Sequence, residues 1–174
     1  MDLAIVSWVS EHMRCAFLDW LMPLITMLGD KGAIWLVFCA ILIVRKKTRC
    51  WGVMCFVALI LTTLLGEITI KNLVGRARPF THFPELLLLI SPPASFSFPS
   101  GHTGSSFAAA TVICFMSKKL GCWALLLAAL IGFSRLYLSV HYLTDIITGM
   151  LLGVVCAYLA RWLCDKYWKT GEIQ

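Results

Sequence analysis

Apolar residues fill most of this chain in long stretches, which short polar segments interrupt. Five of these stretches predict membrane-crossing helices, at about residues 31–44, 50–70, 102–116, 120–138 and 142–163. Several are shorter than the ~20 apolar residues that a span usually needs, so we expect tilt, local thinning and snorkelling cations to help them cross. The pattern predicts an all-α, polytopic transmembrane helix bundle of about five spans.

The first 30 residues follow a different pattern. Their apolar stretches, at residues 3–9 and 17–28, are interrupted by several charged residues and by Pro23, and Asp30 is interpreted as an interfacial or loop charge. We expect a helical hairpin that lies on the outer membrane interface. A sixth span is the alternative, and it would place the N-terminus inside. The rest of the sequence contains no linker or internal repeat that would divide it further. We therefore predict two regions, an interfacial segment over 1–30 and a transmembrane domain over 31–170.

Composition supports a membrane protein, and charge indicates its orientation. The chain is 60% hydrophobic with a mean hydropathy of +0.85, which is more apolar surface than a soluble domain of 174 residues could bury. The net charge of +6 comes from clusters at residues 45–49, 118–119 and 161–169, without the aromatic and basic face that nucleic acid would need. The positive-inside rule places these clusters in the cytoplasm, so the alternate connections should face outward from the cytoplasmic membrane.

Residues capable of chemistry gather in three fragments at the connections expected to face outward. Isolated charges at membrane depth are costly, so their presence there indicates a function. In contrast, the eight cysteines have no CxxC spacing and mostly lie in or at the ends of apolar stretches, which predicts neither a zinc site nor a disulfide framework. The three fragments are Lys71 with Arg78-Pro79, then Pro99-Ser100-Gly101-His102, then Ser134-Arg135 with His141 and Asp145.

The third fragment has the spacing of an oriented nucleophile. His141 and Asp145 are four residues apart at the start of a predicted helix, so the carboxylate should lie one turn from the imidazole on the same face. Asp145 can then accept the proton of Nδ1 and leave Nε2 free to attack phosphorus. The alternative is a structural pair that caps the helix.

The second fragment has the features of a phosphate-binding helix start. Ser100 is a candidate N-cap, Gly101 allows the backbone to approach a ligand closely, and the free amides of a helix start bind phosphate. His102 would stand beside the leaving oxygen as a general acid. Taken alone, the fragment is equally compatible with an ordinary capped turn.

Cations complete the predicted site. Lys71, Arg78 and Arg135 would hold the charge on the phosphoryl oxygens through the transition state. Glu67 precedes Lys71 by four residues, which favours an ion pair that steadies the lysine. Arg76 is interpreted as an interfacial anchor.

In order and spacing, the three fragments resemble the signatures of the type 2 phosphatidic acid phosphatase family, and the resemblance covers roughly residues 31–163. It implies a metal-independent phosphatase without a cofactor, in which His141 is the nucleophile, Asp145 orients it, and His102 acts first as acid and then as base. A phosphohistidine would form and be hydrolysed. Leu143 departs from the family, whose members often have proline there. The phosphate-binding residues would be Lys71, Arg78, Ser100, Gly101 and Arg135.

The lipid substrate is the least determined feature. The resemblance to small outward-facing members of the family favours undecaprenyl diphosphate as the substrate. Phosphatidylglycerol phosphate, phosphatidate and lipid A phosphates are the alternatives. The apolar run at residues 86–90 is expected to help a lipid tail enter sideways. Vanadium-dependent haloperoxidases have similar motifs, but the predicted membrane spans argue against this class of enzyme. A non-catalytic lipid-phosphate binder or transporter is the alternative of another class, and an oriented nucleophile opposite an acid argues for catalysis.

Overall fold

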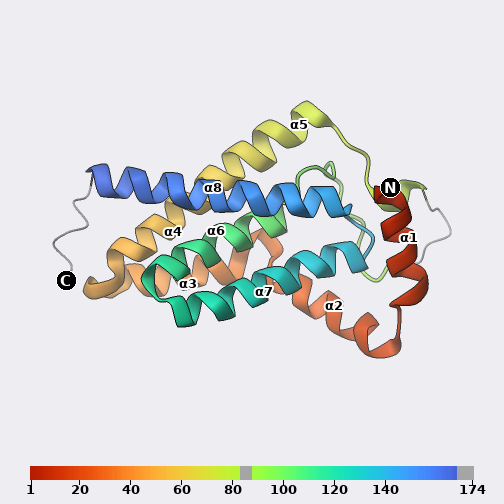
Figure 1. Ribbon diagram of the computed structural model, residues 1–174, viewed down its shortest axis with the longest axis horizontal. Helices are drawn as coiled ribbons and strands as arrows, with labels where there is room; N and C mark the ends of the chain where they lie inside the picture. The colour runs from red at the N-terminus through yellow and green to blue at the C-terminus, as the bar shows by residue number, and fades with distance from the viewer. Residues whose placement is uncertain (83–87, 168–174) are drawn as a thin grey trace.

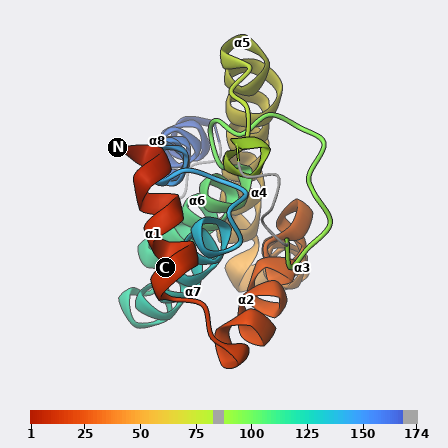
Figure 2. The ribbon, with the colours of Figure 1, turned by 90° about the vertical axis from the view of Figure 1, so that its right-hand side faces the viewer.

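The computed structural model describes residues 1–82 and 88–167, and all the regular structure within them is helical. The longer helices run along one axis, and α1 lies across one end of the bundle (Figures 1 and 2). The helices are α1 (Asp2–His12), α2 (Ala16–Leu28), η1 (Asp30–Gly32), α3 (Ala33–Val44), η2 (Lys46–Thr48), α4 (Arg49–Thr62), η3 (Thr63–Ile70), α5 (Lys71–Val74), η4 (Pro79–His82), α6 (Gly101–Met116), α7 (Lys118–Tyr137) and α8 (Leu143–Tyr167).

The helices confirm a multi-pass membrane bundle without confirming five spans. Among the described residues, three helical segments are long and apolar enough to cross a bilayer, at Lys46–His82, Lys118–Tyr137 and Leu143–Tyr167. The bent pair Ala16–Leu28 and Asp30–Val44 makes a fourth if it counts as one span. Helix α6 has only 16 residues, and it packs chiefly on α7 and α8 inside the bundle. Its short length therefore reflects a central position among longer helices.

Small residues bring α6 and α8 into close contact. A methyl group added to Gly153 would lie 2.3 Å from the carbonyl oxygen of Gly104 and 2.9 Å from the backbone nitrogen of Ala108. A methyl group added to Gly149 would lie 2.5 Å from the carbonyl oxygen of Ser100. This approach holds the start of α6 against the start of α8, so that the second and third polar fragments meet.

Replacement of Gly153 by alanine should destabilise the bundle. The added methyl would meet backbone atoms that a rotamer change cannot move aside, so we expect a loss of ~1–3 kcal/mol, as for other overpacked cores. Thermal unfolding in detergent measures the loss. Leu151→Ala is the control, since this side chain is 57% exposed on the same helix. An unchanged midpoint in Gly153→Ala would contradict the close packing.

A break between α2 and α3 places a polar turn beside α6. The two helices are bent by 41° around η1, where Lys31 and Gly32 have positive φ angles of 51° and 67°. Both α1 and α2 pack on α7, through a cluster that includes Val6 and Met22. The N-terminal segment thus covers one end of the bundle, while its location on a membrane interface stays a prediction.

Helix α4 continues into a π-helical segment, η3, before it ends in α5. The hydroxyl of Thr69 donates to the carbonyl oxygen of Leu64, five residues back, and Gly75 ends α5 with a φ angle of 60°. Such wide turns are rare and often occur at functional sites. Here the segment carries Glu67 and leads to Lys71, and both side chains line a cavity.

Candidate active site

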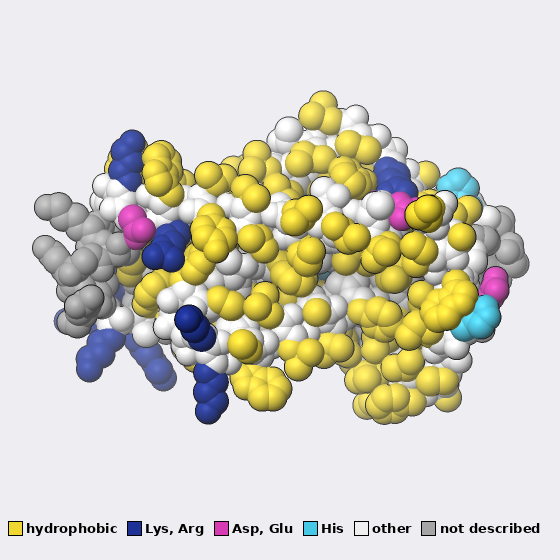
Figure 3. Space-filling view, in the orientation of Figure 1, with side chains coloured by type: hydrophobic (Ala, Val, Ile, Leu, Met, Phe, Trp, Pro, Cys, Tyr) yellow, Lys and Arg dark blue, Asp and Glu magenta, His cyan; other side chains and the backbone are white. Residues whose placement is uncertain are grey.

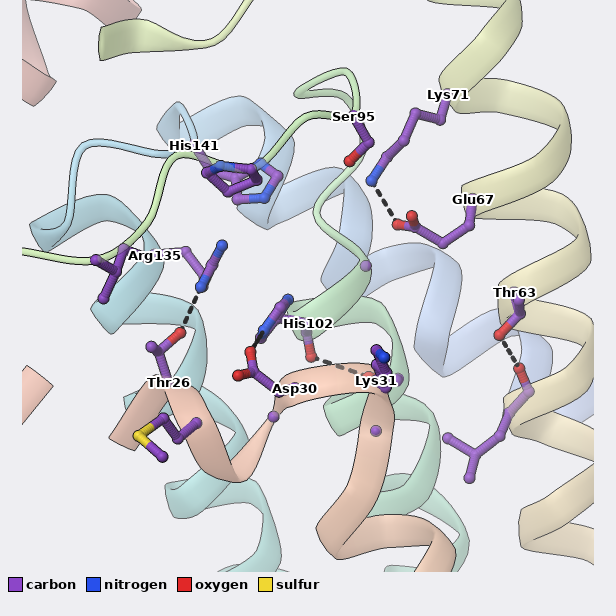
Figure 4. Close-up of a pocket in the computed structure, with 18 of the residues that line it drawn as sticks. Thr26, Asp30, Lys31, Thr63, Glu67, Lys71, Ser95, His102, Arg135 and His141 are labelled. Carbon is purple, nitrogen blue, oxygen red and sulfur yellow. Dashed lines mark hydrogen bonds and ion pairs between the residues drawn. The ribbon is translucent and has the colours of Figure 1, made fainter. Parts of the chain in front are cut away.

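The predicted site residues meet at one cavity of about 1150 Å³ near the end of the bundle that α1 covers (Figure 4). Its walls come from every helix from α2 to α7 except η2 and η4, and from the segments that precede α6 and α8. Two predicted residues, Ser100 and Asp145, are buried behind the wall. The other six line the cavity: Lys71, Arg78, Gly101, His102, Arg135 and His141.

His141 lies just before α8, and its two ring nitrogens have different neighbours. Nε2 lies 3.2 Å from Nη1 of Arg78, while Nδ1 lies 3.4 Å from Oδ2 of Asp145. A guanidinium only donates, so Nε2 accepts and the ring proton belongs on Nδ1. Burial lowers the pKa of His141 well below its usual range, although the hydrogen bond to Asp145 opposes this shift. The arrangement keeps the lone pair of Nε2 available at neutral pH.

Asp145 is fully buried and has a partner at each carboxylate oxygen. Oδ2 accepts from Oγ of Ser97 at 2.5 Å and from the backbone nitrogen of Tyr142 at 2.9 Å. Oδ1 accepts from Nη1 of Arg76 at 2.6 Å. These contacts fix the carboxylate, and through it the imidazole of His141.

The interpretation of Arg76 as an interfacial anchor is wrong. Its guanidinium forms ion pairs with Asp145 and Asp2 and lies 3.8 Å from the ring centre of Tyr142. Asp2 also accepts from the hydroxyl of Thr144. Arg76 thus joins α1 to the start of α8 and compensates the buried charge of Asp145. In the sequence, the position of Arg76 two residues before Arg78 was the signal that could have placed it near the site.

Arg78 lines the cavity and also contacts the segments around the nucleophile. Its guanidinium forms five hydrogen bonds to protein atoms. Apart from the contact with His141, it donates to the carbonyl oxygens of Ser95, Phe96 and Val140 and to Oγ of Ser95. The guanidinium therefore fixes the backbone on both sides of the nucleophile.

Arg135 has a free donor for an anion. Its Nη1 donates to the hydroxyl of Thr26 at 2.5 Å, but its buried Nε has no hydrogen-bond partner among the described residues. An unpaired buried donor is costly, and a phosphoryl oxygen would satisfy it. The carbonyl oxygen of Arg135 also accepts from the backbone nitrogen of His141, which places cation and imidazole together.

The start of α6 has the predicted cap. Oγ of Ser100 accepts from the backbone nitrogen of Thr103 at 3.4 Å and from its hydroxyl at 2.9 Å. The backbone nitrogen of Ser100 donates to the carbonyl oxygen of Asp145 at 3.0 Å. Ser100 thus shapes the helix start from behind, while Gly101 and His102 face the cavity.

Asp30 is a member of the site that the sequence interpretation missed. Its Oδ1 lies 2.7 Å from Nε2 of His102, so it accepts a hydrogen bond from this ring at the break between α2 and α3. The interpretation as a loop charge is therefore incomplete. The signal was available: Gly29-Asp30-Lys31-Gly32 places charges and glycines between two apolar stretches.

Asp30→Asn should slow phosphate release by about tenfold to a hundredfold, the range typical of a weakened general acid. An amide leaves the ring of His102 less well oriented and removes the charge that favours its protonated form. Initial rates at saturating lipid measure the effect. Glu11→Gln removes a charge at the far end of α1 and is the control. Equal rates for Asp30→Asn and wild type would show that this pair is not part of the site.

The remainder of the cavity is largely apolar. Side chains of Leu36, Phe56, Leu59, Ile60 and Leu64 line it along α3, α4 and η3. From the apolar run at residues 86–90, Leu89 and Ile90 also line the cavity, while residues 86–87 lie outside the described part of the chain. In the described residues, no three His, Cys, Asp or Glu side chains are grouped as a metal site would require.

Comparisons with known proteins agree with the fold and the motifs. Residues 51–169 match the PAP2 superfamily. The undecaprenyl-diphosphatase of Sulfolobus acidocaldarius is 31% identical over 151 residues, which are 86% of this chain and 72% of that protein.

Solved structures resemble this one as well, and two of them are similar to it in both fold and sequence. The LpxE of Aquifex aeolicus has a TM-score of 0.81 at 28% identity, with 92% of this chain and 94% of that chain covered. The PAP2 type phosphatidylglycerolphosphate phosphatase from Bacillus subtilis has a TM-score of 0.77 at 27% identity, with 97% and 87% covered. Sequence, fold and site geometry lead to one conclusion: this chain belongs to the PAP2 superfamily and is a membrane lipid phosphatase.

Proposed function

We propose that this chain hydrolyses undecaprenyl diphosphate at the outer face of the cytoplasmic membrane, through a phosphohistidine at His141. The observation that carries this proposal is the position of His141, whose Nε2 lies 3.2 Å from Nη1 of Arg78 and whose side chain lines a cavity together with Lys71, Arg135 and His102. A non-catalytic binder would not need a nucleophile fixed by a buried carboxylate opposite a second histidine.

The residues support a two-step displacement. Nε2 of His141 attacks the terminal phosphorus, the bond to the bridging oxygen breaks, and protonated His102 gives that oxygen its proton. Undecaprenyl phosphate leaves. His102 then removes a proton from water, whose oxygen attacks the phosphohistidine, so that phosphate departs and the lone pair of Nε2 is restored. Lys71, Arg135 and the amides at the start of α6 would hold the phosphoryl oxygens in both steps.

Charge distribution supports an outward-facing site. The basic residues of η2 and of the turn before α7 lie at the end of the bundle opposite α1, where Figure 3 shows a group of lysines and arginines. The cavity lies near the other end. If the basic end faces the cytoplasm, the cavity opens toward the outer leaflet.

Two further observations favour a polyprenyl diphosphate. The relative from Sulfolobus acidocaldarius carries the name undecaprenyl-diphosphatase and aligns over most of both chains. In addition, the cavity extends from His141 along apolar residues of α3 and α4, which provides a path for a hydrocarbon tail. One alternative is phosphatidylglycerophosphate, which the likeness to the Bacillus subtilis phosphatase supports, and phosphatidate is another.

Phosphate release from a lipid panel in detergent tests the proposal. The panel contains undecaprenyl diphosphate, phosphatidylglycerophosphate, phosphatidate and a lipid A phosphate, each with and without a chelator of divalent metals. We expect the highest kcat/KM for undecaprenyl diphosphate and no effect of the chelator. A higher value for a glycerolipid would overturn the substrate, and loss of activity with chelator, restored by a divalent ion, would overturn the metal-free mechanism.

A further inference from the structure

The carboxylate of Glu67 lies where a bound phosphate would need space. Its Oε1 is 2.5 Å from Nζ of Lys71, and both side chains line the cavity (Figure 4). The same oxygen lies against the start of α6, because a methyl group added to Gly101 would be 2.0 Å from it. An anion from the protein is therefore already present between the lysine and the helix start.

Both neighbours of this carboxylate attract anions. Lys71 is a cation whose side chain is only 5% exposed, and the amides of the first turn of α6 carry partial positive charge. A phosphoryl group held by the same two neighbours would be a second anion within a few ångströms of Glu67. Two such charges repel strongly away from bulk water, so they cannot share the position.

Glu67 has room to move away. Its side chain is 37% exposed, in contrast to Lys71, and it borders the open cavity of about 1150 Å³. Its ion pair with Lys71 confirms the predicted i,i+4 contact. The contact with Gly101 is a separate feature, which a purely steadying partner of the lysine would not need.

We propose that Glu67 is a displaceable resident anion, which occupies the phosphate position in the empty site and competes with phosphate after each turnover. The inference rests on the proposed function, because it assumes that Lys71 and the start of α6 receive the phosphoryl group. Substrate binding moves the carboxylate aside. Its return weakens the hold on the phosphate product, which lets phosphate leave against the attraction of Lys71 and Arg135.

Charge removal at this position should tighten the binding of tetrahedral anions. In Glu67→Gln we expect orthovanadate and inorganic phosphate to bind about tenfold tighter, since the competing charge is gone and the side-chain shape is kept. Glu67→Asp keeps the charge but is one methylene shorter, so it cannot reach both neighbours and should bind about threefold tighter. Asp165→Asn removes the same charge near the end of α8, far from the cavity, and should bind as wild type does.

Calorimetric titration of the full-length protein in detergent with orthovanadate, then with inorganic phosphate, tests the proposal. Tighter binding in Glu67→Gln supports it. Affinity equal to wild type, or weaker, overturns it and leaves Glu67 as a partner that only steadies Lys71. Thermal unfolding checks each variant, and if Glu67→Gln does not fold, Glu67→Asp decides by the same criterion. The titration does not require turnover, so its outcome does not depend on which lipid is the substrate. An error in the proposed substrate would be detected only by the lipid panel.

Discussion

Phosphate release by His141→Gln is expected to fall by at least about 10⁴-fold, the scale on which loss of a nucleophile acts in other enzymes that form covalent intermediates. Glutamine keeps a polar group near Arg78 but cannot form the P–N bond. Initial rates with the preferred lipid measure the loss. In addition, brief reaction of the wild type with terminally labelled substrate should leave acid-labile label on the protein, and the variant should carry none.

The matched control for this variant is His12→Gln, because His12 is an exposed residue at the end of α1. It should release phosphate at the wild-type rate. If His141→Gln retained more than a tenth of the activity, or if it still carried acid-labile label, His141 would not be the nucleophile. In that case the buried pair of His141 and Asp145 would be the structural cap that the sequence also allows.

The second large effect is expected for Asp145→Asn, which should lower kcat by about 10³ to 10⁴-fold, as the equivalent change does in serine protease triads. The amide of asparagine does not reliably hold the proton on Nδ1 of His141. In the other tautomer Nε2 carries the proton and has no lone pair for attack on phosphorus. It also leaves Arg76 without its buried partner, and a broken buried ion pair is destabilising. Steady-state kinetics and thermal unfolding together separate the two effects.

A smaller change at the same carboxylate provides the control. Ser97→Ala removes one hydrogen bond to Oδ2 but leaves the charge, the contact with Arg76 and the contact with His141. Its kcat should fall by no more than about 150-fold, since one hydrogen bond to a charged group contributes roughly 1.5–3 kcal/mol at most and each 1.4 kcal/mol is about tenfold in rate. A loss in Ser97→Ala as large as in Asp145→Asn would show that packing, and not the tautomer of His141, limits the rate.

The sequence predicted the helical membrane fold and the motifs because both are local. Long apolar stretches indicate membrane helices without any knowledge of the fold. A pair such as Glu67 and Lys71, four residues apart, comes into contact within a single helix. The close approach of α6 and α8 had only a weak signal in the sequence, the spacing of Gly149 and Gly153, because small residues at such spacings are frequent in membrane helices. The number of spans was less predictable, because a central helix such as α6 need not be long.

Only the tertiary structure decided which distant side chains are partners. Arg76 and Asp145 are 69 residues apart, His102 and Asp30 are 72 apart, and Arg135 and Thr26 are 109 apart. No periodicity connects such pairs, since each depends on a bend, a helix crossing or a turn set by packing elsewhere. The sequence by itself determined the chemical groups of the site. The bundle determined their distances, their burial and the partners that hold each of them in place, because these depend on helix packing that no local pattern encodes.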